Sequence, residues 1–242
     1  MSTFANAHAA VTDSVTDSMT DSMTDSVTDA VTDAATHSPA DSAAYERLHA
    51  DAVTQLSSWR APDLAQAAIR DAFLRHLAAH PDAMAKAGPP AHFTGSVLVL
   101  DADLTSVLLT HHRKARQWFQ FGGHYEPGDL SVWHAATREG REESGLTDLT
   151  VLPDIVQLDR HVLVGDFGRC HEHLDIRFAA VAPANSEHVV SDESLDVKWW
   201  PVDALPSGTR AELGPLVDAA IRSVTRARRT DSDRLAQRDT SV

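Results

Sequence analysis

One helix, expected between Ser131 and Gly145 among several β-like runs, most constrains the fold of this chain, and we call it the marked helix. Ser131 is a typical N-cap for that helix, and Gly145 follows its last turn as a C-terminal stop. Three further helices are expected, at about 44–59, at 63–79 and near 209–225. β-like runs lie on both sides of the marked helix, at residues 94–101, 106–110, 118–121, 162–165, 171–181 and 197–200. This order predicts an α/β layered domain preceded by a short helical segment.

Composition excludes several classes of partner. The chain has 242 residues, 43% of them hydrophobic, which suffices for one domain with a core and some accessory segments. The formal net charge is −14, and without the seven aspartates of residues 1–42 there remain 28 acids against 21 bases. Such a body lacks the clustered Lys and Arg that hold polynucleotides or anionic membranes. We expect no polynucleotide and no membrane as partner, and a homodimer is left open.

The single cysteine and the absence of long apolar runs bear on the cellular compartment in which the protein is expected. Cys170 is the only cysteine, so no intrachain disulfide forms, which suits a reducing cytoplasm. No apolar run approaches the roughly 20 residues needed to span a bilayer. The N-terminus has neither the basic start nor the apolar stretch of a secretory signal. A cytoplasmic protein is therefore expected.

The composition divides the chain into four segments. From Val11 a four-residue unit with fixed Thr and Asp repeats, and such a unit cannot build a core. We expect residues 1–42 to be a disordered acidic repeat, with an amphipathic or partner-induced helix as the alternative. Residues 44–86 are expected to be a helical segment packed on a catalytic domain of residues 92–224, and residues 225–242 a polar disordered tail.

Three carboxylates share one face of the marked helix. Glu139, Glu142 and Glu143 are spaced i, i+3, i+4 near its C-terminal end. Like charges repel one another, and the helix dipole disfavours negative charge at this terminus, so the arrangement is costly without a cation. Carboxylate oxygens suit Mg²⁺ or Mn²⁺. Arg138, one turn before Glu142, is placed to pair with that carboxylate.

A solvated acidic helix face is the ordinary explanation for such a string, but its context favours a site. The helix follows Gly122-Gly123 and the run Glu126-Pro127-Gly128-Asp129, entered from the β-like run at 118–121. A glycine-rich turn of this kind lets backbone groups approach both a metal and a phosphate.

The segment resembles the signature of the Nudix hydrolases, which is a glycine, five residues, a glutamate, seven residues, then Arg-Glu-apolar-x-Glu-Glu-x-Gly-apolar. Here Gly123 is followed after five residues by Asp129, and after eight more by REGREESGL at residues 138–146. The order GGH-x-EPGD, this helix, H-x-H-x-D-I-R-F and a closing helix is similar to a group of small Nudix hydrolases over about residues 44–224. The resemblance implies an α/β/α sandwich with a mixed β-sheet.

Three departures from the signature stand out. Asp129 replaces glutamate, the spacer after it is one residue longer, and Gly140 replaces a bulky apolar residue. Asp129 keeps the charge but is one methylene shorter, so its supporting role is open. Glycine inside a helix costs about 1 kcal/mol relative to alanine. Gly140 therefore either permits close approach by a bulky neighbour or weakens the helix.

The resemblance also implies roles for individual residues. Glu139, Glu142 and Glu143 would bind the metal with the Gly123 carbonyl, and Arg138 would orient a helix carboxylate. The substrate would be a small phosphorylated molecule, a nucleoside diphosphate linked to another moiety. Metal ions neutralise the bridging phosphates and lower the pKa of the attacking water, after which a carboxylate takes its proton.

Further residues are candidates for the general base and for contacts with the substrate. Glu142 is the first choice for the base or for a ligand of the nucleophilic water. Glu193, in a polar loop before the run at 197–200, is the second, with an ordinary loop acid as the alternative. His171 and His173 alternate along one expected strand, and His124 leaves the glycine turn. These histidines would contact substrate phosphates or a further metal, unless they line a half-exposed strand face.

Metal-dependent hydrolysis of a phosphoanhydride is the function that this sequence predicts. An isoprenoid diphosphate isomerase would need a catalytic cysteine, and Cys170 lies beside the H-x-H run, not ahead of the glycine turn. A silent Nudix-like domain that binds a nucleotide as a sensor or scaffold would be expected to lose helix carboxylates. All three glutamates are present, which favours the enzyme.

Overall fold

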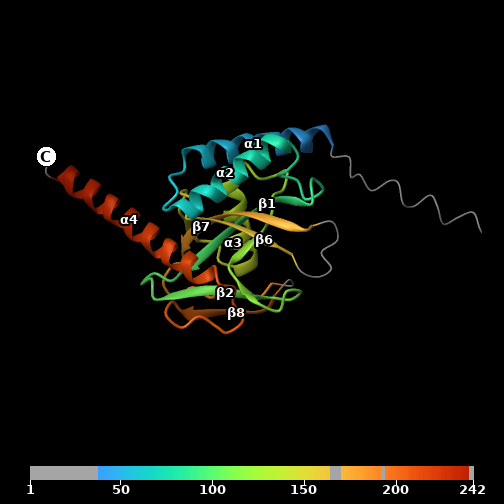
Figure 1. Ribbon diagram of the computed structural model, residues 1–242. Helices are drawn as coiled ribbons and strands as arrows, with labels where there is room; N and C mark the ends of the chain where they lie inside the picture. Colours follow the sequence, from blue (N-terminus) through green and yellow to red (C-terminus); the bar gives the residue numbers. More distant parts are fainter. Residues whose placement is uncertain (1–37, 164–169, 192–193, 240–242) are drawn as a thin grey trace, which may run out of the picture. The chain divides into compact units, whose positions relative to one another are not determined.

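One mixed β-sheet with helices on both faces forms the body of the protein (Figure 1). The computed structural model describes residues 38–163, 170–191 and 194–239. The strands are β1 (Ala91–Leu100), β2 (Ser106–His112), β3 (Trp118–Phe119), β4 (Phe121–His124), β5 (Thr150–Val151), β6 (Gln157–Val162), β7 (Glu172–Val181) and β8 (Ser194–Pro201). The helices are α1 (Pro39–Ser58), α2 (Leu64–Ala79), α3 (Val132–Ser144) and α4 (Leu213–Asp239).

Strand β1 is the centre of the sheet. It runs parallel to β7 along its whole length, from the pair Ala91↔Glu172 to Leu100↔Val181. On its other side β1 pairs antiparallel first with β4 and then with β2. β2 also pairs with β3 and β8, and β7 with β5 and β6, all antiparallel. The sheet is therefore mixed, as the resemblance implied.

Alternation along β1 separates two hydrophobic cores. Val97 and Val99 face the core shared with α1, α2 and α3. Leu98 and Leu100 face the core shared with α4. Successive side chains of a strand point to opposite faces, so a near-continuous apolar run is what a strand covered on both faces requires. The predicted α/β layered architecture is confirmed.

The two N-terminal helices are tied to the domain by hydrogen bonds as well as by apolar packing. Trp59 Nε1 donates to the Ile155 carbonyl at 2.7 Å. The Gln66 amide pairs with the backbone of Leu158 through both of its heteroatoms, at 2.9 and 2.8 Å. Gln66 thereby satisfies exposed backbone groups of β6 that would otherwise form a sheet edge.

Helix boundaries agree with the sequence except at the start of α1 and at the C-terminus. α2 lies close to the expected 63–79, and Asp63 caps it by accepting from Gln66 N. α1 ends close to the expected residue 59 but begins at Pro39, so residues 39–42, which were expected to be disordered, are helical. α4 was expected to end near residue 225, with a polar tail beyond it, but continues to Asp239. Arg, the commonest residue from position 226 to 239, is a strong helix former that needs no apolar face. No helix in the described part of the chain is long and apolar enough to cross a membrane.

Two predicted segments extend beyond the described residues, and two strands of the structure were not predicted. The acidic repeat up to residue 37 lies outside the described ranges, as does the second half of the β-like run at 162–165. β5 and β6 were not predicted, and β6 ends at Val162 where that run was expected to begin. β6 alternates buried and exposed positions only weakly, because Asp159 and His161 occupy partly buried positions in it.

Gly140 is explained by close packing of α3 on β1. A Cβ added to Gly140 would lie 2.6 Å from Val97 Cγ1 and 3.4 Å from Leu149 Cδ1, and both side chains are buried. A real Cβ essentially never approaches another atom so closely. Glycine here lets the helix that carries the glutamates pack closely against the sheet.

We expect Gly140→Ala to lower the free energy of unfolding by about 1–3 kcal/mol, because overpacking outweighs the gain in helix propensity. Gly214→Ala in α4 is the matched control, since its added Cβ has no neighbour within 4 Å. It should be neutral or slightly stabilising. Urea unfolding of both variants is the measurement, and a Gly140→Ala protein as stable as the wild type would contradict the packing explanation. Combining it with Val97→Ala should cost less than the sum of the single changes.

Candidate metal and catalytic site

Helix α3 is fixed at both ends. Ser131 accepts from His134 N at 3.1 Å as the N-cap, and Gly145 ends the helix with φ of 72°, both as predicted. Asp51 of α1 adds a second cap, since its Oδ2 accepts from Val132 N at 2.8 Å. A carboxylate at a helix N-terminus also stabilises the helix, because its negative charge interacts favourably with the helix dipole. The N-terminal helical segment therefore helps to hold the helix that carries the glutamates.

The two glycines of β4 let the helix carboxylates reach the strand. Gly122 N donates to Glu143 Oε2 at 3.1 Å. A Cβ on Gly123 would lie 2.5 Å from Glu139 Oε1, and a Cβ on Gly122 would collide with Ser96. The Gly-Gly pair is thus required by close approach on both faces of the strand. The turn expected from the sequence meets the helix at the position of its carboxylates.

Arg138 is the hub of the site. Its Nε and Nη2 donate to the two oxygens of Asp129, each at 3.0 Å, in a bidentate pair. Its Nη1 donates to Glu139 Oε1 at 3.0 Å and to Glu142 Oε2 at 3.2 Å. Nη2 also donates to the carbonyl of His124 at 3.1 Å. One guanidinium thereby joins the turn, the end of β4 and the carboxylate face of the helix.

Asp129 is the buried anchor of this hub. Its side chain is 4% exposed, and its Oδ2 also accepts from Glu126 N at 2.8 Å. The departure from the signature at this position therefore preserves a carboxylate that orients Arg138. The sequence left this role open because the added spacer residue obscured where Asp129 would lie relative to the helix.

Burial and negative charge perturb the titration of the site. Burial raises the pKa of Glu139 to about 7; the charge and hydrogen bond of Arg138 oppose this rise, and the charges of Glu142 and Glu126 add to it. Burial also works against the charged form of Arg138, but the hydrogen bond to Asp129 and the neighbouring carboxylates raise its pKa above the ordinary value. The carboxylates outnumber this guanidinium, so an added cation would stabilise their charged forms.

The glutamates differ in exposure. The Glu139 side chain is 13% exposed, whereas that of Glu142 is 60% exposed and reaches solvent beyond its contact with Arg138. Glu143 turns toward β4. Carboxylate oxygens backed by a glycine strand form a hard donor set, which suits Mg²⁺ or Mn²⁺ and not a soft metal. These residues fit a divalent cation at the edge of β4.

The predicted histidines separate in the structure. His124 and His173 lie together with His92 and Cys170, and the ligand atoms of these four residues are all within 4.8 Å of one another. His171 is exposed, precedes β7 and is not a member of this group. Burial lowers the pKa of His124 to about 3 and that of His173 to about 4, with further lowering by neighbouring histidines.

The rest of the H-x-H-x-D-I-R-F run forms a buried polar network. Asp175 accepts from Ser96 Oγ at 2.7 Å and from Arg177 Nε at 2.8 Å. Arg177 also donates to Asp159 Oδ2 at 2.9 Å. Each buried charge therefore has a partner, as buried charges require. This network joins β1, β6 and β7 beside the histidines.

Sequence reasoning missed two contributors and named one residue that the structure does not describe. His92 was overlooked because it lies in an apolar run, and only the β1–β7 register sets it opposite His173. Asp51 was overlooked because nothing in α1 signals a contact with α3. Glu193, the second choice for the base, lies outside the described residues.

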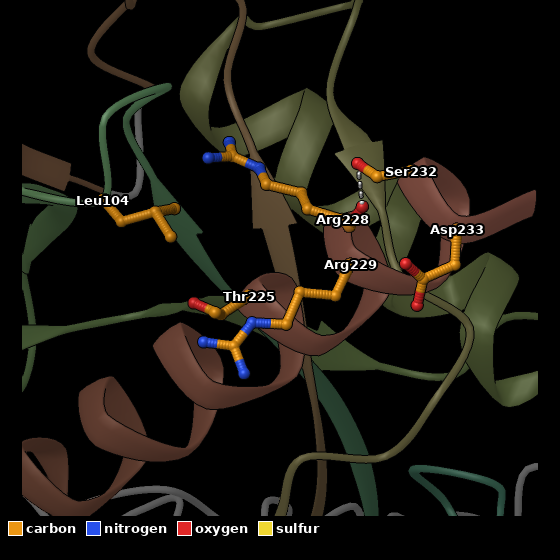
Figure 2. Close-up of a pocket in the computed structure, with 6 residues that line it drawn as sticks. All are labelled: Leu104, Thr225, Arg228, Arg229, Ser232 and Asp233. Atoms are coloured by element: carbon orange, nitrogen blue, oxygen red, sulfur yellow. Dashed lines mark hydrogen bonds between the residues drawn. The ribbon is translucent and has the colours of Figure 1, made fainter. Parts of the chain in front are cut away.

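The structure has a surface pocket of about 390 Å³, whose lining residues are drawn in Figure 2. All but one of its residues belong to α4, which packs on the sheet face opposite α3. Arg228 at its wall donates to the Ala102 carbonyl at 2.9 Å. The pocket shares no residue with the carboxylate hub, so we assign it no part in the chemistry. Its lining residues are Leu104, Thr225, Arg228, Arg229, Ser232 and Asp233.

Comparison with known proteins identifies the region that contains the hub. A family model described as NUDIX domain matches residues 91–220, from the start of β1 into α4. The match includes α3 and the glycine turn and leaves α1 and α2 outside. No curated protein matches the chain significantly.

Several solved structures are similar to this chain. A NUDIX-family hydrolase from Clostridium perfringens is 26% identical over 52% of this chain and 96% of its own, with a TM-score of 0.41. An Ap4A hydrolase of C. elegans is 20% identical over 55% of this chain and 97% of its own, with a TM-score of 0.46. The dihydroneopterin triphosphate pyrophosphohydrolase of E. coli is 21% identical over 55% and 96%, with a TM-score of 0.46.

Two acids that contact Arg138 should differ in their effect on stability. Asp129→Asn removes the buried charged partner, and we expect the free energy of unfolding to fall by about 2–3 kcal/mol. Glu126→Gln is the control, because Glu126 lies 3.8 Å from the same guanidinium with a 63% exposed side chain. It should change stability by less than about 1 kcal/mol. Equal losses in denaturant unfolding would show that Asp129 is not the anchor.

Proposed function

The chain belongs to the Nudix family, and from this premise we propose that it hydrolyses a phosphoanhydride, in a nucleoside diphosphate linked to another moiety, with the aid of Mg²⁺ or Mn²⁺. The observation that carries the proposal is the carboxylate hub around Arg138, which lies on the helix and turn within the matched domain. Hydrolases of this family share that helix, and this chain retains its three glutamates.

Glu139, Glu142 and Glu143, with the Gly123 carbonyl, are the proposed metal ligands. When bound, the cation would neutralise phosphate charge and lower the pKa of the attacking water. The protein's own part is orientation, since Arg138 fixes Glu139 and Glu142 relative to each other. The close contact between Glu139 and Gly123 sets the carboxylate against the strand. Positioning of this kind is the main contribution of a protein to phosphoryl chemistry.

Glu142 is the proposed acceptor of the water proton. Its side chain is 60% exposed, against 13% for that of Glu139, so it can reach a water that attacks phosphorus. Arg138 contacts it through a single nitrogen, which leaves its other oxygen for water or metal. Glu193 stays a proposal for the same role. His171, exposed beside β7, is the histidine best placed to meet an anionic substrate in solution.

A purified-protein assay tests the function directly. The full chain is incubated with Mg²⁺ or Mn²⁺ and a panel of nucleoside triphosphates, sugar nucleotides, dinucleotides and coenzyme A, and phosphate or pyrophosphate release is followed. Hydrolysis in water enriched in heavy oxygen should place the label on a phosphate product, as attack at phosphorus requires. Metal-dependent binding of a nucleotide without turnover of any compound would instead favour a silent sensor.

With a substrate in hand, Glu142→Gln and Glu143→Gln should each lower kcat by about a hundredfold or more, because each removes a metal ligand or base. Asp148→Asn is the matched control, an exposed acid just beyond the helix with no assigned role. Its rate should equal that of the wild type. Metal-dependent turnover that persists unchanged in both glutamate variants would overturn the site assignment.

A further inference from the structure

Four metal-binding side chains meet on the sheet face opposite α3. His92 on β1 is the register partner of His173 on β7, and the adjacent β1 position Thr94 pairs with His124 on β4. Residues 92 and 94 of a strand point the same way, so the pairing gathers the three imidazoles on one face. Cys170, just before β7, completes the group.

The spacing of these groups is that of ligands around one small ion. Zn²⁺ bound at about 2.0–2.1 Å to nitrogen and about 2.3 Å to sulfur sets neighbouring tetrahedral donors roughly 3.3–3.6 Å apart. The Nε2 atoms of His92 and His124 are 3.1 Å apart, and all four ligand atoms lie within 4.8 Å of one another. Side-chain shifts of about an ångström therefore suffice for coordination.

A hydrogen bond to the backbone orients the imidazole of His92 for metal binding. His92 Nδ1 lies 3.0 Å from the Pro89 carbonyl, and in the tautomer that donates this bond its Nε2 lone pair points into the group. A carbonyl that holds the outer N–H is a usual partner of a metal-binding histidine. His173 Nε2 is buried and has no hydrogen-bond partner in the described part of the chain.

An ordinary hydrogen bond between histidines does not account for the whole group. A proton shared by His92 and His124 would satisfy that pair but would leave the buried nitrogen of His173 unpaired beside them. An unsatisfied buried polar group costs about 1–3 kcal/mol. A cation at the centre would accept lone pairs from all four residues at once.

We propose that His92, His124, His173 and Cys170 bind a Zn²⁺ ion, in a site separate from the carboxylates of α3. Three imidazole nitrogens and one thiolate suit a borderline-soft transition ion, whereas Mg²⁺ and Ca²⁺ prefer oxygen. Four protein ligands fill a tetrahedral shell, so the site is structural. His124 links it to the hub, because the same residue offers its carbonyl to Arg138.

Metal content of the full chain tests this proposal. Protein purified with Zn²⁺ present and then dialysed should retain about one zinc per chain, measured by elemental analysis. Cys170→Ser and His92→Ala should weaken zinc binding by more than the roughly ten- to hundredfold that loss of an outer partner costs. His171→Ala is the control for zinc content, an exposed histidine next to the group that should leave stoichiometry unchanged. Glu142→Gln should also keep its zinc.

Co²⁺ substitution distinguishes this site from loose surface binding. The cobalt protein should show the intense absorption of a tetrahedral ion and a thiolate charge-transfer band, and Cys170→Ser should lose that band. Circular dichroism verifies that each variant is folded, and Cys170→Ser provides the conservative change should His92→Ala not fold. Wild-type protein without stoichiometric zinc, or folded Cys170→Ser protein that binds zinc as tightly as the wild type, would overturn the proposal.

Discussion

The bidentate pair between Arg138 and Asp129 is the interaction on which the site depends. It fixes a guanidinium beneath the glycine turn, and from there one nitrogen reaches Glu139 and Glu142. A planar fork with fixed donors can hold several acceptors in set positions, which a flexible ammonium cannot. Because Asp129 is buried, the pair is screened less by solvent than a surface ion pair. The carboxylates are therefore arranged before any cation or substrate arrives.

Contacts elsewhere in the fold hold Arg138 and the carboxylates around it in place. Gly140 lets α3 pack closely on β1, and the glycines of β4 let its carboxylates reach the neighbouring strand. Helix α1 lies outside the matched domain, yet its Asp51 caps α3. The histidine–cysteine group on the opposite sheet face ends at His124, whose carbonyl contacts Arg138. The two proposed sites, which differ in donor chemistry, would thus share one residue of β4.

Features that depend on neighbouring residues could be predicted from the sequence, whereas contacts set by strand register could not. Ser131, Gly145 and the glutamate spacing each depend on residues within one helix, so they were identified correctly. His92 joined the site only through pairing of β1 with β7, some eighty residues apart, and no local pattern encodes that register. The function of Asp129 was open for a different reason, because the spacer between Asp129 and Arg138 is one residue longer than in the signature. α4 runs past its expected end because helix propensity, not an apolar face, sustains its last turns.

Mn²⁺ binding to Arg138→Lys protein tests the central claim most directly. The substitution keeps the positive charge but removes the fork that holds Asp129 and the two glutamates together. Free Mn²⁺ is measured by electron paramagnetic resonance, and binding that remains in Glu142→Gln protein defines the background. We expect the dissociation constant at the carboxylate site to rise by about tenfold or more, as for loss of an orienting partner. An unchanged Mn²⁺ affinity in folded Arg138→Lys protein would contradict the claim that Arg138 positions the metal ligands.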